Sequence, residues 1–571
     1  MPEIINYCAE GGIVEMRLTG AEILIKCLEE QGVDIIFGYP GGAVLPIYDV
    51  LYFTPTIRHV RTCHEQGAAH AADGYARATG KVGVCLATSG PGATNLVTGI
   101  ATAYMDSVPI VAITGQVPRN LLGKDSFQEV DITGITIPIT KHNYLVKDVE
   151  KLADTIREAF YIAKSGRPGP VLIDLPKDVM LSETEFSPYD PKKLSKSFPD
   201  DTALDLRELD CAVNALNESK KPVLYVGGGV INSGATEQVV ELAEKFLIPV
   251  TTTLMGIGGF PGKHPLYLGM LGMHGTAPAN FAISHCDLLI AVGARFDDRA
   301  VGKFESFAPE AKIIHIDIDP AEIGKNIHVD IPIVGDVKKV LEIINSRLEP
   351  IRQREWLKQV DKWKKDYPLK YCNNGKLKPQ YIIEQIYELT DGDAIITTEV
   401  GQNQMWAAQF YRFKNPRSLI SSGGLGTMGY GLPAALGAQL GRPDKKVFNI
   451  AGDGSFLMNC HELATAVNYK LPINIILLNN QSLGMVRQWQ DMFFGKRFSS
   501  VNLEDSTDFV KLAEAYGAVG LRVKKKEDVR PILMKALNIE KPVLIECVVD
   551  PDEKVFPMVP AGGALHEMIG I

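Results

Sequence analysis

The stretch from Lys446 to Trp489 narrows the possible folds of this chain more than any other. It contains two short apolar runs rich in β-branched residues, Val447–Ala451 and Ile473–Leu478, with a helical pattern over Met458–Tyr469 between them. Apolar runs of this length are typical of buried strands, and two consecutive strands joined through a helix run parallel. The stretch therefore predicts a strand–helix–strand unit within an α/β sheet.

Each of these predicted strands leads into a polar tip. Gly452-Asp453-Gly454 follows the first strand and Asn479-Asn480 follows the second. Parallel strands end at the same edge of a sheet, where open α/β sheets bind their ligands. One carboxylate and one amide oxygen suit a Mg²⁺ ion shared with a phosphate, and the glycines let the backbone approach a diphosphate. Gly-Asp-Gly alone is more often a turn at a strand end, but its pairing with Asn-Asn favours the metal site.

The pairing of these two tips resembles the metal–diphosphate signature of thiamine-diphosphate enzymes. Further segments resemble the acetohydroxyacid synthase (acetolactate synthase) family, and the resemblance covers almost the whole chain after Met16. The matching segments are GYPGGAVLPIYDVL, HEQGAAHAADGYARATG, TSGPGATN, TGQV, SFQE, GRPGPVLIDLPKDV, TTTLMGIGGFPGKHPLYLGMLGMHG and GARFDDR. The last two resemble the FAD-binding segments of the anabolic members, which separates them from the flavin-free catabolic enzymes.

Length and composition bound the class of protein. A chain of 571 residues has room for about three domains. Its 46% apolar and 22% charged residues are typical of a soluble globular protein, and the net charge of −9 indicates no nucleic-acid partner. Nine scattered cysteines without a CxxC pair favour reduced thiols in a cytoplasmic protein. No apolar run reaches the length of about 18 residues that a membrane span needs.

We expect three doubly wound α/β domains with mainly parallel sheets. The segments GAAHAADGYARATGKVGVCLATSGPG and GLPAALGAQLGRPDKKVFNIAGDG share one plan of helix, turn, strand and glycine-rich loop, which predicts that the first and last domains are duplicates. The polar stretches Lys192–Asp201 and Asp361–Lys378 are the expected connectors. The resulting division is an N-terminal extension over 1–15, a thiamine pyrimidine-binding domain over 16–183, a linker over 184–205, a central FAD-binding domain over 206–347, a linker over 348–378, a thiamine diphosphate/Mg-binding domain over 379–550 and a C-terminal tail over 551–571.

Glu65 stands where a predicted strand meets an alanine-rich helix, so we expect its carboxylate to be buried. A buried carboxylate needs a partner or a raised pKa. The simpler alternative is an acid at a helix N-terminus, favoured by the helix dipole. An HExxH zinc motif is excluded because the second histidine, His70, lies one residue too far along. The resemblance implies that Glu65 hydrogen-bonds N1′ of the aminopyrimidine and so favours the imino tautomer that removes the C2 proton.

The resemblance also assigns residues to the substrates. Gly42 would offer its N–H to a developing oxyanion, and Arg299 would hold the carboxylate of the acceptor. Trp489 would leave room for an ethyl group beside the acceptor, and one methylene is worth about 1–3 kcal/mol, so we expect 2-ketobutyrate to be preferred over pyruvate. Lys177 could equally be an ordinary solvated lysine. The implied catalytic residues are Glu65, Gly42, Gln128, Lys177, Arg299, Met485 and Trp489. Two further residues, Gln116 and Phe127, are implied to line the substrate channel.

The resemblance implies three cofactors, namely thiamine diphosphate, Mg²⁺ and a non-redox FAD. The coenzyme residues are Val400, Gly401, Gln402, Gly426, Met428, Gly452, Gly454 and Ser455, with Met428 as the apolar shelf under the two rings. The metal ligands are Asp453, Asn480 and Ser482. The FAD residues are Gly228, Thr253, Leu254, Leu271, Met273, His274, Gly293, Arg295, Asp297 and Asp317.

Two details run against simple motif matching. Gly424–Gly429 satisfies the dinucleotide fingerprint GxGxxG, but the acidic residue that follows at the required distance, Asp444, lies in a polar turn instead of at a strand end. Asn403 stands where relatives usually carry histidine, and an amide cannot titrate near neutral pH. A nicotinamide site is therefore disfavoured, and so is any proton-transfer role at position 403.

The expected function is that of an acetolactate synthase. It decarboxylates pyruvate on thiamine diphosphate and transfers the hydroxyethyl unit to a second pyruvate or to 2-ketobutyrate, in branched-chain amino acid biosynthesis. The family further implies a homodimer or homotetramer with sites between subunits, and a small regulatory subunit. The alternatives are another enzyme of this fold, such as a pyruvate oxidase or glyoxylate carboligase, or a non-catalytic nucleotide-binding protein.

Overall fold

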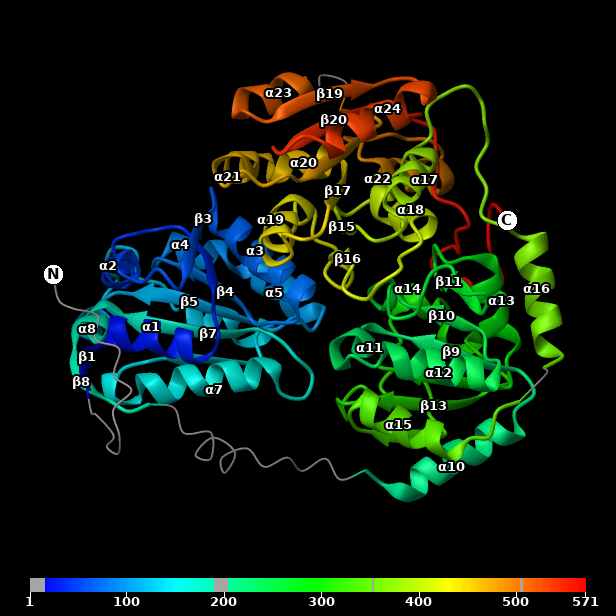
Figure 1. Cartoon of the computed structure of the whole chain (residues 1–571), viewed down its shortest axis with the longest axis horizontal. Coiled ribbons are helices and arrows are strands. Elements are labelled where there is room, and N and C mark those ends of the chain that lie inside the picture. Colours follow the sequence, from blue (N-terminus) through cyan, green and yellow to red (C-terminus); the bar gives the residue numbers. More distant parts are fainter. Residues whose placement is uncertain (1–15, 189–203, 352–353, 504–506) are drawn as a thin grey trace. The chain divides into compact units, whose positions relative to one another are not determined.

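A computed structural model describes residues 16–188, 204–351, 354–503 and 507–571. It contains three six-stranded sheets, each flanked by helices (Figure 1). Every strand pair in these sheets is parallel, which confirms the expected fold class. The expected N-terminal extension and the polar connector Lys192–Asp201 lie outside the described residues.

The chain divides into two compact units. Of the described residues, one unit comprises 16–69, 82–100 and 109–188, and the other comprises 70–81, 101–108 and those from 204 onward. The first sheet belongs to the former unit, whereas the central and last sheets belong to the latter. The division runs through helix α3 (Glu65–Thr79), whose first turn lies in one unit and whose remainder lies in the other.

The first sheet has the strand order β3-β2-β4-β5-β7-β6. Its inner strand β5 is buried at every position, as expected for a parallel strand covered on both faces. Helix α1 (Gly20–Glu30) begins after Thr19, which forms a capping box with Glu22. The strands are β2 (Ile35–Gly38), β3 (Arg58–Arg61), β4 (Gly83–Ala87), β5 (Ile110–Gln116), β6 (His142–Leu145) and β7 (Val171–Pro176), and the other helices are α2 (Leu45–Tyr52), α4 (Pro91–Asn95), α5 (Val97–Met105), α6 (Ile132–Thr136), α7 (Leu152–Lys164) and α8 (Lys177–Leu181).

A two-stranded antiparallel sheet stands apart from the three larger ones. It pairs β1 (Met16–Thr19) with β8 (Glu183–Phe186), so that Met16 lies opposite Phe186. Residues 184–186, which the sequence assigned to a linker, therefore form part of a strand.

The central sheet has the strand order β11-β10-β9-β12-β13-β14. Counted along the chain this is 3-2-1-4-5-6, the doubly wound order whose ligand site lies where β9 and β12 meet. Helices α10, α12 and α15 cover one face and α13 covers the other (Figure 1). The elements are α10 (Leu206–Glu218), β9 (Pro222–Val226), α11 (Gly228–Ser233), α12 (Thr236–Phe246), β10 (Val250–Thr252), β11 (Tyr267–Met270), α13 (Ala277–His285), β12 (Leu288–Val292), α14 (Asp298–Val301), β13 (Lys312–Asp317), β14 (Ile331–Val334) and α15 (Val337–Arg347).

The linker expected over 348–378 is partly helical. Helix α16 (Trp356–Asp366) buries Trp356 and Val360 in the core that also contains α13. The rings of Trp356 and Trp363 meet edge to face with centroids 5.4 Å apart. The charged residues of this segment line the outer face of a docked helix, so its charge alone did not make it a free connector.

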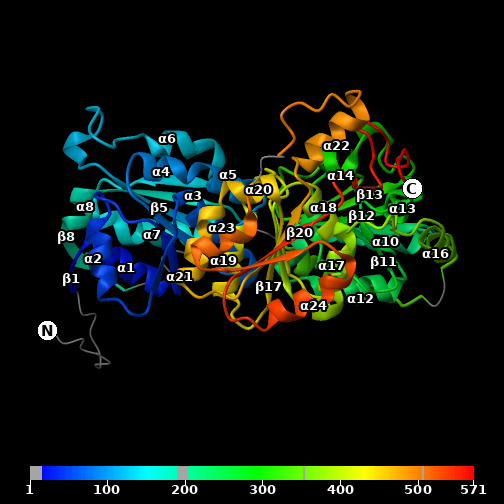
Figure 2. The ribbon, with the colours of Figure 1, turned by 90° about the horizontal axis from the view of Figure 1, so that it is seen from above.

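The last sheet has the strand order β16-β15-β17-β18-β20-β19. Counted along each domain, it and the first sheet share the order 2-1-3-4-6-5, which confirms the predicted duplication. Figure 2 shows α17 and α24 on one side of the last sheet and α19, α21 and α23 on the other. The elements are α17 (Pro379–Thr390), β15 (Ile395–Thr398), α18 (Gln402–Phe410), β16 (Leu419–Ile420), α19 (Gly431–Gly441), β17 (Val447–Gly452), α20 (Asp453–Met458), α21 (Leu463–Asn468), β18 (Asn474–Asn479), α22 (Gly484–Phe493), α23 (Phe509–Tyr516), β19 (Val519–Val523), α24 (Lys526–Leu537) and β20 (Val543–Val548).

The helix expected over Met458–Tyr469 is in fact broken. It starts earlier, at Asp453, ends at Met458 and resumes as α21 after a short 3₁₀ turn. Asn459 stands at the break, and its side-chain amide donates to the carbonyl of Gly429 at 2.7 Å. A tertiary hydrogen bond thus overrides the helical periodicity.

Candidate functional site

The two polar tips leave the last sheet side by side, as the sequence predicted. Strands β17 and β18 pair in parallel with Gly452 opposite Leu478, and each leads directly into its tip. Strands β15 and β17 are also neighbours, and the order of strands reverses between them. This is the switch point at which open α/β sheets bind ligands.

Asp453 has a buried carboxylate, and only one of its two oxygens accepts a hydrogen bond among the described residues. The Gly454 N–H donates to Oδ1 at 3.0 Å, whereas Oδ2 has no hydrogen-bond partner among the described residues. Burial raises the pKa of this carboxyl group to about 6, despite the surrounding backbone N–H donors. An unpaired buried carboxylate oxygen is costly, so the arrangement favours a cation at this position.

Asn480 and Ser482 lie together in one turn at the second tip. The amide oxygen of Asn480 accepts from the Ser482 N–H at 3.1 Å and from its hydroxyl at 3.3 Å. The amide nitrogen donates to the Gln402 side chain at 3.2 Å. The structure thus brings two expected metal ligands and one expected coenzyme residue into contact, with the amide oxygen engaged in its own turn.

The segment from Ser421 to Tyr430, called here the 421–430 loop, carries Gly426 and Met428 beside the same edge. Gly426 has a φ of +71°, and a Cβ there would meet nothing closer than the Val400 side chain at 3.9 Å. Two expected coenzyme residues, Val400 and Gly426, therefore lie next to open space. This is room that a bound group could occupy.

Glu399 is a buried carboxylate at this edge that the sequence analysis missed. It accepts from the backbone N–H of Gly429 at 2.8 Å, from that of Leu432 at 3.0 Å and from the Ser455 hydroxyl at 2.9 Å. Burial raises its pKa, against the effect of these donors. Ser455, an expected coenzyme residue, is thereby tied to the end of β15 and to the 421–430 loop. An acid after a strand end was the available signal, but it is too common to have stood out.

Gln402 and Asn403 begin α18, and the side-chain amide nitrogen of each makes two hydrogen bonds. The Gln402 amide donates to Gln488 at 2.9 Å and to the Glu553 carbonyl at 3.1 Å. The Asn403 amide donates to the carbonyls of Glu399 at 3.1 Å and Ile450 at 2.8 Å. One amide nitrogen can make both of these bonds, whereas a neutral histidine nitrogen carries a single hydrogen. The Asn403 side chain therefore links the ends of β15 and β17 by hydrogen bonds.

Three residues expected near the acceptor or the flavin meet in a second cluster. The Arg299 guanidinium lies over the Trp489 ring, 5.9 Å from its centroid, and Nη1 lies 3.7 Å from the Met273 sulfur. The Arg299 side chain is 63% exposed, with Asp298 as a neighbour at 3.6 Å. Met485 lies one turn before Trp489 on α22 and packs against the core of the last domain. The guanidinium is thus held at the surface with its donors available.

The switch point of the central sheet is built from close backbone approaches. A Cβ at Gly229 would fall 2.7 Å from the Gly293 Cα, and Gly293 itself has a φ of +54°. His274 is buried with Nδ1 unpaired among the described residues, and burial lowers its pKa to about 4. Bare backbone at the switch point suits a nucleotide-type ligand, and the unpaired Nδ1 of the neutral His274 ring is free to make a further hydrogen bond.

Of the remaining expected FAD residues, three accept hydrogen bonds from neighbouring backbone N–H groups, and the others differ in how deeply they are buried. Thr253 and Asp297 are N-caps, accepting from the N–H groups of Gly256 at 2.8 Å and Arg299 at 3.0 Å. Asp317 ends β13 and accepts from the Asp319 N–H at 2.9 Å. Leu271 is buried, and the positions that are half-buried are Gly228, Leu254, Met273 and Arg295.

At the carboxyl edge of the first sheet, Glu65 begins α3 and is half-buried, so the expectation of a buried carboxylate is wrong for the chain alone. The Asn95 amide donates to its Oε2 at 2.9 Å, and a Cβ at Gly92 would lie 3.2 Å from its Oε1. The first turn of a helix opens to solvent and stabilises an acid there. Asn95, at the end of TSGPGATN, is the partner that sequence reasoning did not single out.

The expected channel residues of this unit lie around the same edge. The Lys177 ammonium donates to the Gly42 carbonyl at 3.0 Å, which brings these two residues together. Gln128 has a φ of +60°, and a Cβ at Gly90 would lie 2.9 Å from it. Phe127 is exposed, whereas Gln116 is buried.

A further buried carboxylate, Asp174, holds Gln116 in place. It accepts from Thr114 at 2.7 Å and from the Gln116 amide at 3.0 Å, and the same amide donates to the Val130 carbonyl at 2.8 Å. Burial raises the pKa of Asp174 to about 7. This group fixes the segment that carries Gln128.

Within the described ranges, no group of three or more His, Cys, Asp or Glu side chains could hold a metal ion. A metal at the Asp453 edge would therefore rely on amide, backbone or phosphate oxygens beside a single carboxylate, as is usual for Mg²⁺. In the same part of the chain, no helix is long and apolar enough to cross a membrane.

Comparison with known proteins agrees with this geometry. Residues 18–135 match the N-terminal TPP binding domain of thiamine pyrophosphate enzymes, 209–344 their central domain and 399–547 their C-terminal TPP binding domain. The chain is 52% identical over 569 residues to the acetolactate synthase large subunit of Cyanidium caldarium, covering 97% of both chains. It is 51% identical over 564 residues to a probable acetolactate synthase large subunit of Methanocaldococcus jannaschii (97% of this chain, 95% of the relative) and 52% identical over 565 residues to an acetolactate synthase of Mycobacterium bovis (97% and 91%). The chain therefore belongs to the acetolactate synthase family of thiamine-diphosphate enzymes.

Proposed function

We propose that the chain is the catalytic subunit of an acetolactate synthase. It decarboxylates pyruvate and joins the remaining two-carbon unit to a second pyruvate or to 2-ketobutyrate, which gives 2-acetolactate or 2-aceto-2-hydroxybutyrate for branched-chain amino acid synthesis. The observation that carries the proposal is the unpaired buried oxygen of Asp453 at the switch point of the last sheet. It lies in the part of the chain that matches the C-terminal TPP binding domain.

The residues at this edge fit a Mg²⁺ ion and a diphosphate. Asp453 offers an anionic oxygen, while Asn480 and Ser482 lie in the adjoining turn. Val400, Gly401, Gln402, Gly452, Gly454 and Ser455 would surround the diphosphate, with Gly426 and Met428 beside the rings. Bound thiamine diphosphate supplies a nucleophilic carbon and an electron sink, which no protein side chain provides.

The side chains of the protein would bind, orient and move protons. Glu65, oriented by Asn95, would hold a proton at N1′ of the pyrimidine. The Gly42 N–H would face the substrate oxygen, with the Gly42 carbonyl fixed by Lys177. Arg299, held against Trp489, would pair with the carboxylate of the acceptor through its planar fork.

The central domain would hold FAD as a structural group. The glycine-lined backbone at the switch point and the unpaired Nδ1 of His274 are compatible with a dinucleotide. The proposed reaction involves no net oxidation, so FAD would have no electron to transfer. Its loss should lower the stability of the central domain more than it alters the chemical step.

We propose that two chains build each site, one contributing Glu65 and the other Asp453. Mixing inactive Glu65→Gln and Asp453→Asn enzymes under subunit exchange should then restore about a quarter of wild-type activity, since half the dimers are mixed and each holds one intact site. A mixture that stays inactive would place both residues in one chain. Relatives named large subunits imply a small regulatory partner, and nine scattered cysteines without a CxxC pair suit the cytoplasm.

One assay tests the function as a whole. Purified chain with Mg²⁺, thiamine diphosphate and FAD should convert pyruvate to acetolactate, and added 2-ketobutyrate should divert the product to 2-aceto-2-hydroxybutyrate. Consumption of O₂ with pyruvate would indicate an oxidase instead. Binding of thiamine diphosphate without release of CO₂ would indicate a non-catalytic protein.

A further inference from the structure

The 421–430 loop is held by hydrogen bonds near both ends and is exposed to solvent in the middle. Near its start, the Ser421 hydroxyl bonds the Thr398 hydroxyl at 2.6 Å and accepts from the Gln404 amide at 2.7 Å. Near its end, Glu399 accepts from the Gly429 N–H at 2.8 Å. Residues 424–426 between these points are exposed. The exposed stretch is the part next to the expected coenzyme, so its shape matters for binding.

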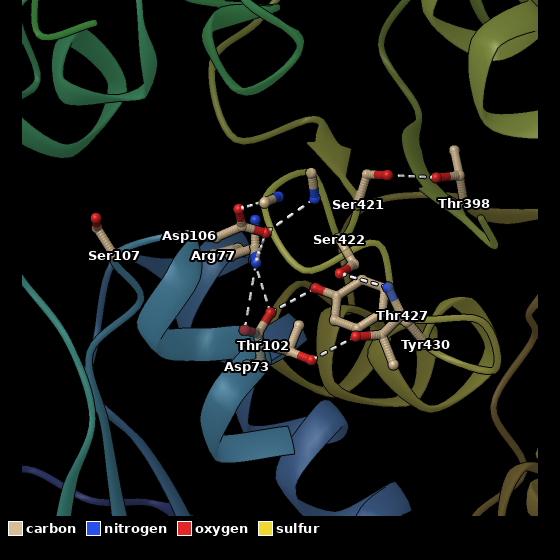
Figure 3. Close-up of polar contacts among 12 residues, drawn as sticks. Asp73, Arg77, Thr102, Asp106, Ser107, Thr398, Ser421, Ser422, Thr427 and Tyr430 are labelled. Carbon is tan, nitrogen blue, oxygen red and sulfur yellow. Dashed lines mark hydrogen bonds and ion pairs between the residues drawn. The ribbon is translucent and has the colours of Figure 1, made fainter. Parts of the chain in front are cut away.

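Asp106 supports the backbone where the exposed stretch begins (Figure 3). It follows helix α5, and its side chain is fully buried. Its Oδ2 accepts from the Gly423 N–H at 3.0 Å and its Oδ1 from the Gly424 N–H at 2.7 Å. Two consecutive N–H groups on one carboxylate fix the orientation of both peptide planes.

A buried arginine links this support to the far end of the loop. The Arg77 guanidinium donates to Asp106 at 2.9 Å and to Asp73 at 2.6 Å, and Asp73 accepts from the Tyr430 hydroxyl. Figure 3 shows Arg77 between the two carboxylates, with Tyr430 to the right of Asp73. Thr102, on α5, bonds the Thr427 hydroxyl at 2.7 Å. One cation therefore neutralises two buried acids, of which one holds the start of the loop and the other its end.

We propose that Asp106, held by Arg77, is a positioning residue for the thiamine-diphosphate site. It fixes the backbone at Gly423 and Gly424 so that Gly426 and Met428 meet the coenzyme in one conformation. This role rests on the proposed function, because it assumes that the 421–430 loop contacts the coenzyme. A loop ordered before binding loses less conformational freedom on binding, which strengthens affinity without any new contact.

The test is Asp106→Asn in the full-length, FAD-loaded chain. Asparagine keeps the shape and one acceptor oxygen, but its NH₂ group cannot accept from the second N–H or from Arg77. We expect the dissociation constant of thiamine diphosphate with Mg²⁺, measured by calorimetry, to rise about tenfold, which corresponds to about 1.4 kcal/mol. In the coenzyme-free protein, amide exchange over residues 421–430 should become faster.

Glu30→Gln is the matched control. Glu30 accepts two hydrogen bonds from Arg157, both at 3.0 Å, and this largely buried pair holds no residue of the 421–430 loop. The control should lower thermal stability as Asp106→Asn does, while leaving coenzyme affinity and exchange over 421–430 unchanged. An effect of equal size on coenzyme affinity in the two variants would show that Asp106 acts only through general stability, and would overturn the proposal.

Tyr430→Phe is a milder second variant, in case Asp106→Asn fails to fold. It removes only the hydroxyl that Asp73 accepts, and a smaller rise in the dissociation constant, about threefold, is expected by the same conversion. Wild-type binding with an unchanged constant in the folded variants would overturn the positioning role alone. Absence of binding by the wild-type chain would overturn the proposed function and this role with it.

Discussion

The sharpest stability prediction concerns Lys378, which lies at the start of the last domain. Its side chain is 5% exposed and pairs with Asp550 at 2.8 Å and with Glu553. Replacing it by methionine leaves two carboxylates facing each other without a buried cation. Breaking a buried pair from one side costs about 3–5 kcal/mol. Because Lys376 also pairs with Asp550, at 3.0 Å, we expect the lower end, about 3 kcal/mol.

Lys376→Met is the matched control, because both lysines pair with the same carboxylate. The Lys376 side chain is 52% exposed, so its pair with Asp550 is screened by solvent and contributes about 0–1 kcal/mol. Urea unfolding followed by tryptophan fluorescence should show a clear drop in midpoint for Lys378→Met and almost none for Lys376→Met. Equal shifts in the two variants would refute the argument that burial decides the cost.

The same cluster predicts a pH dependence. Burial alone would raise the pKa of Asp550, but hydrogen bonds from Asn374, Lys378 and Lys376 outweigh it and hold the pKa below its usual range. A carboxyl group with a depressed pKa stabilises the fold above its unfolded pKa of about 3.9, and this stability is lost as the pH falls below that value. The difference in midpoint between wild type and Lys378→Met should therefore be full at pH 7 and shrink below about pH 4.

Three further predictions concern the site. Trp489→Leu should lower the preference for 2-ketobutyrate over pyruvate by about tenfold, as one methylene is worth about 1–3 kcal/mol, and the ratio of the two products at equal acceptor concentrations measures it. Glu65→Gln should suppress CO₂ release from pyruvate while leaving the affinity for thiamine diphosphate nearly unchanged in calorimetry; full turnover would remove Glu65 from the mechanism. Burial raises the pKa of Asp174 to about 7, so this carboxyl group binds a proton more tightly in the folded state than in the unfolded state. The stability of wild type relative to Asp174→Asn should therefore fall as the pH rises from about 4 to about 7. Denaturation midpoints of the two proteins, measured across that pH range, test this.

The sequence predicted the frame of the last domain because that frame depends on local pattern. Val447–Ala451 and Ile473–Leu478 are strands within one residue, and both polar tips lie at one edge of the sheet. Apolar runs report burial on both faces, and parallel strands leave no choice about which edge their carboxyl ends share. The duplicated strand order follows from the same kind of signal.

Sequence pattern failed where tertiary partners decide. The break at Asn459 depends on the carbonyl of Gly429, which is far away in the chain. Glu399 and Asp106 look like ordinary acids at the ends of a strand and a helix, yet both side chains are buried and accept hydrogen bonds from backbone N–H groups of the 421–430 loop. Glu65 looks like a buried acid, yet it is half-buried in the first turn of α3. The burial of an acid depends on what packs over it, and no local pattern contains that information.

The duplicated fold accounts for the different acid that each copy would supply to the proposed site. Leu86 pairs with the last residue of β2 and Ile450 with the last residue of β15, so the positions three residues on, Ser89 and Asp453, are equivalent. The helices that precede these strands, α3 and α19, are equivalent as well, and they begin with Glu65 and Gly431. Each copy thus has two equivalent positions at the carboxyl edge of its sheet, one at the start of a helix and one at the end of a strand. At these equivalent positions, the first copy has its acid at the helix start, where the proposed site would place the neutral pyrimidine ring. The second copy has its acid at the strand end, where the proposed site would place a metal ion between two neighbouring tips.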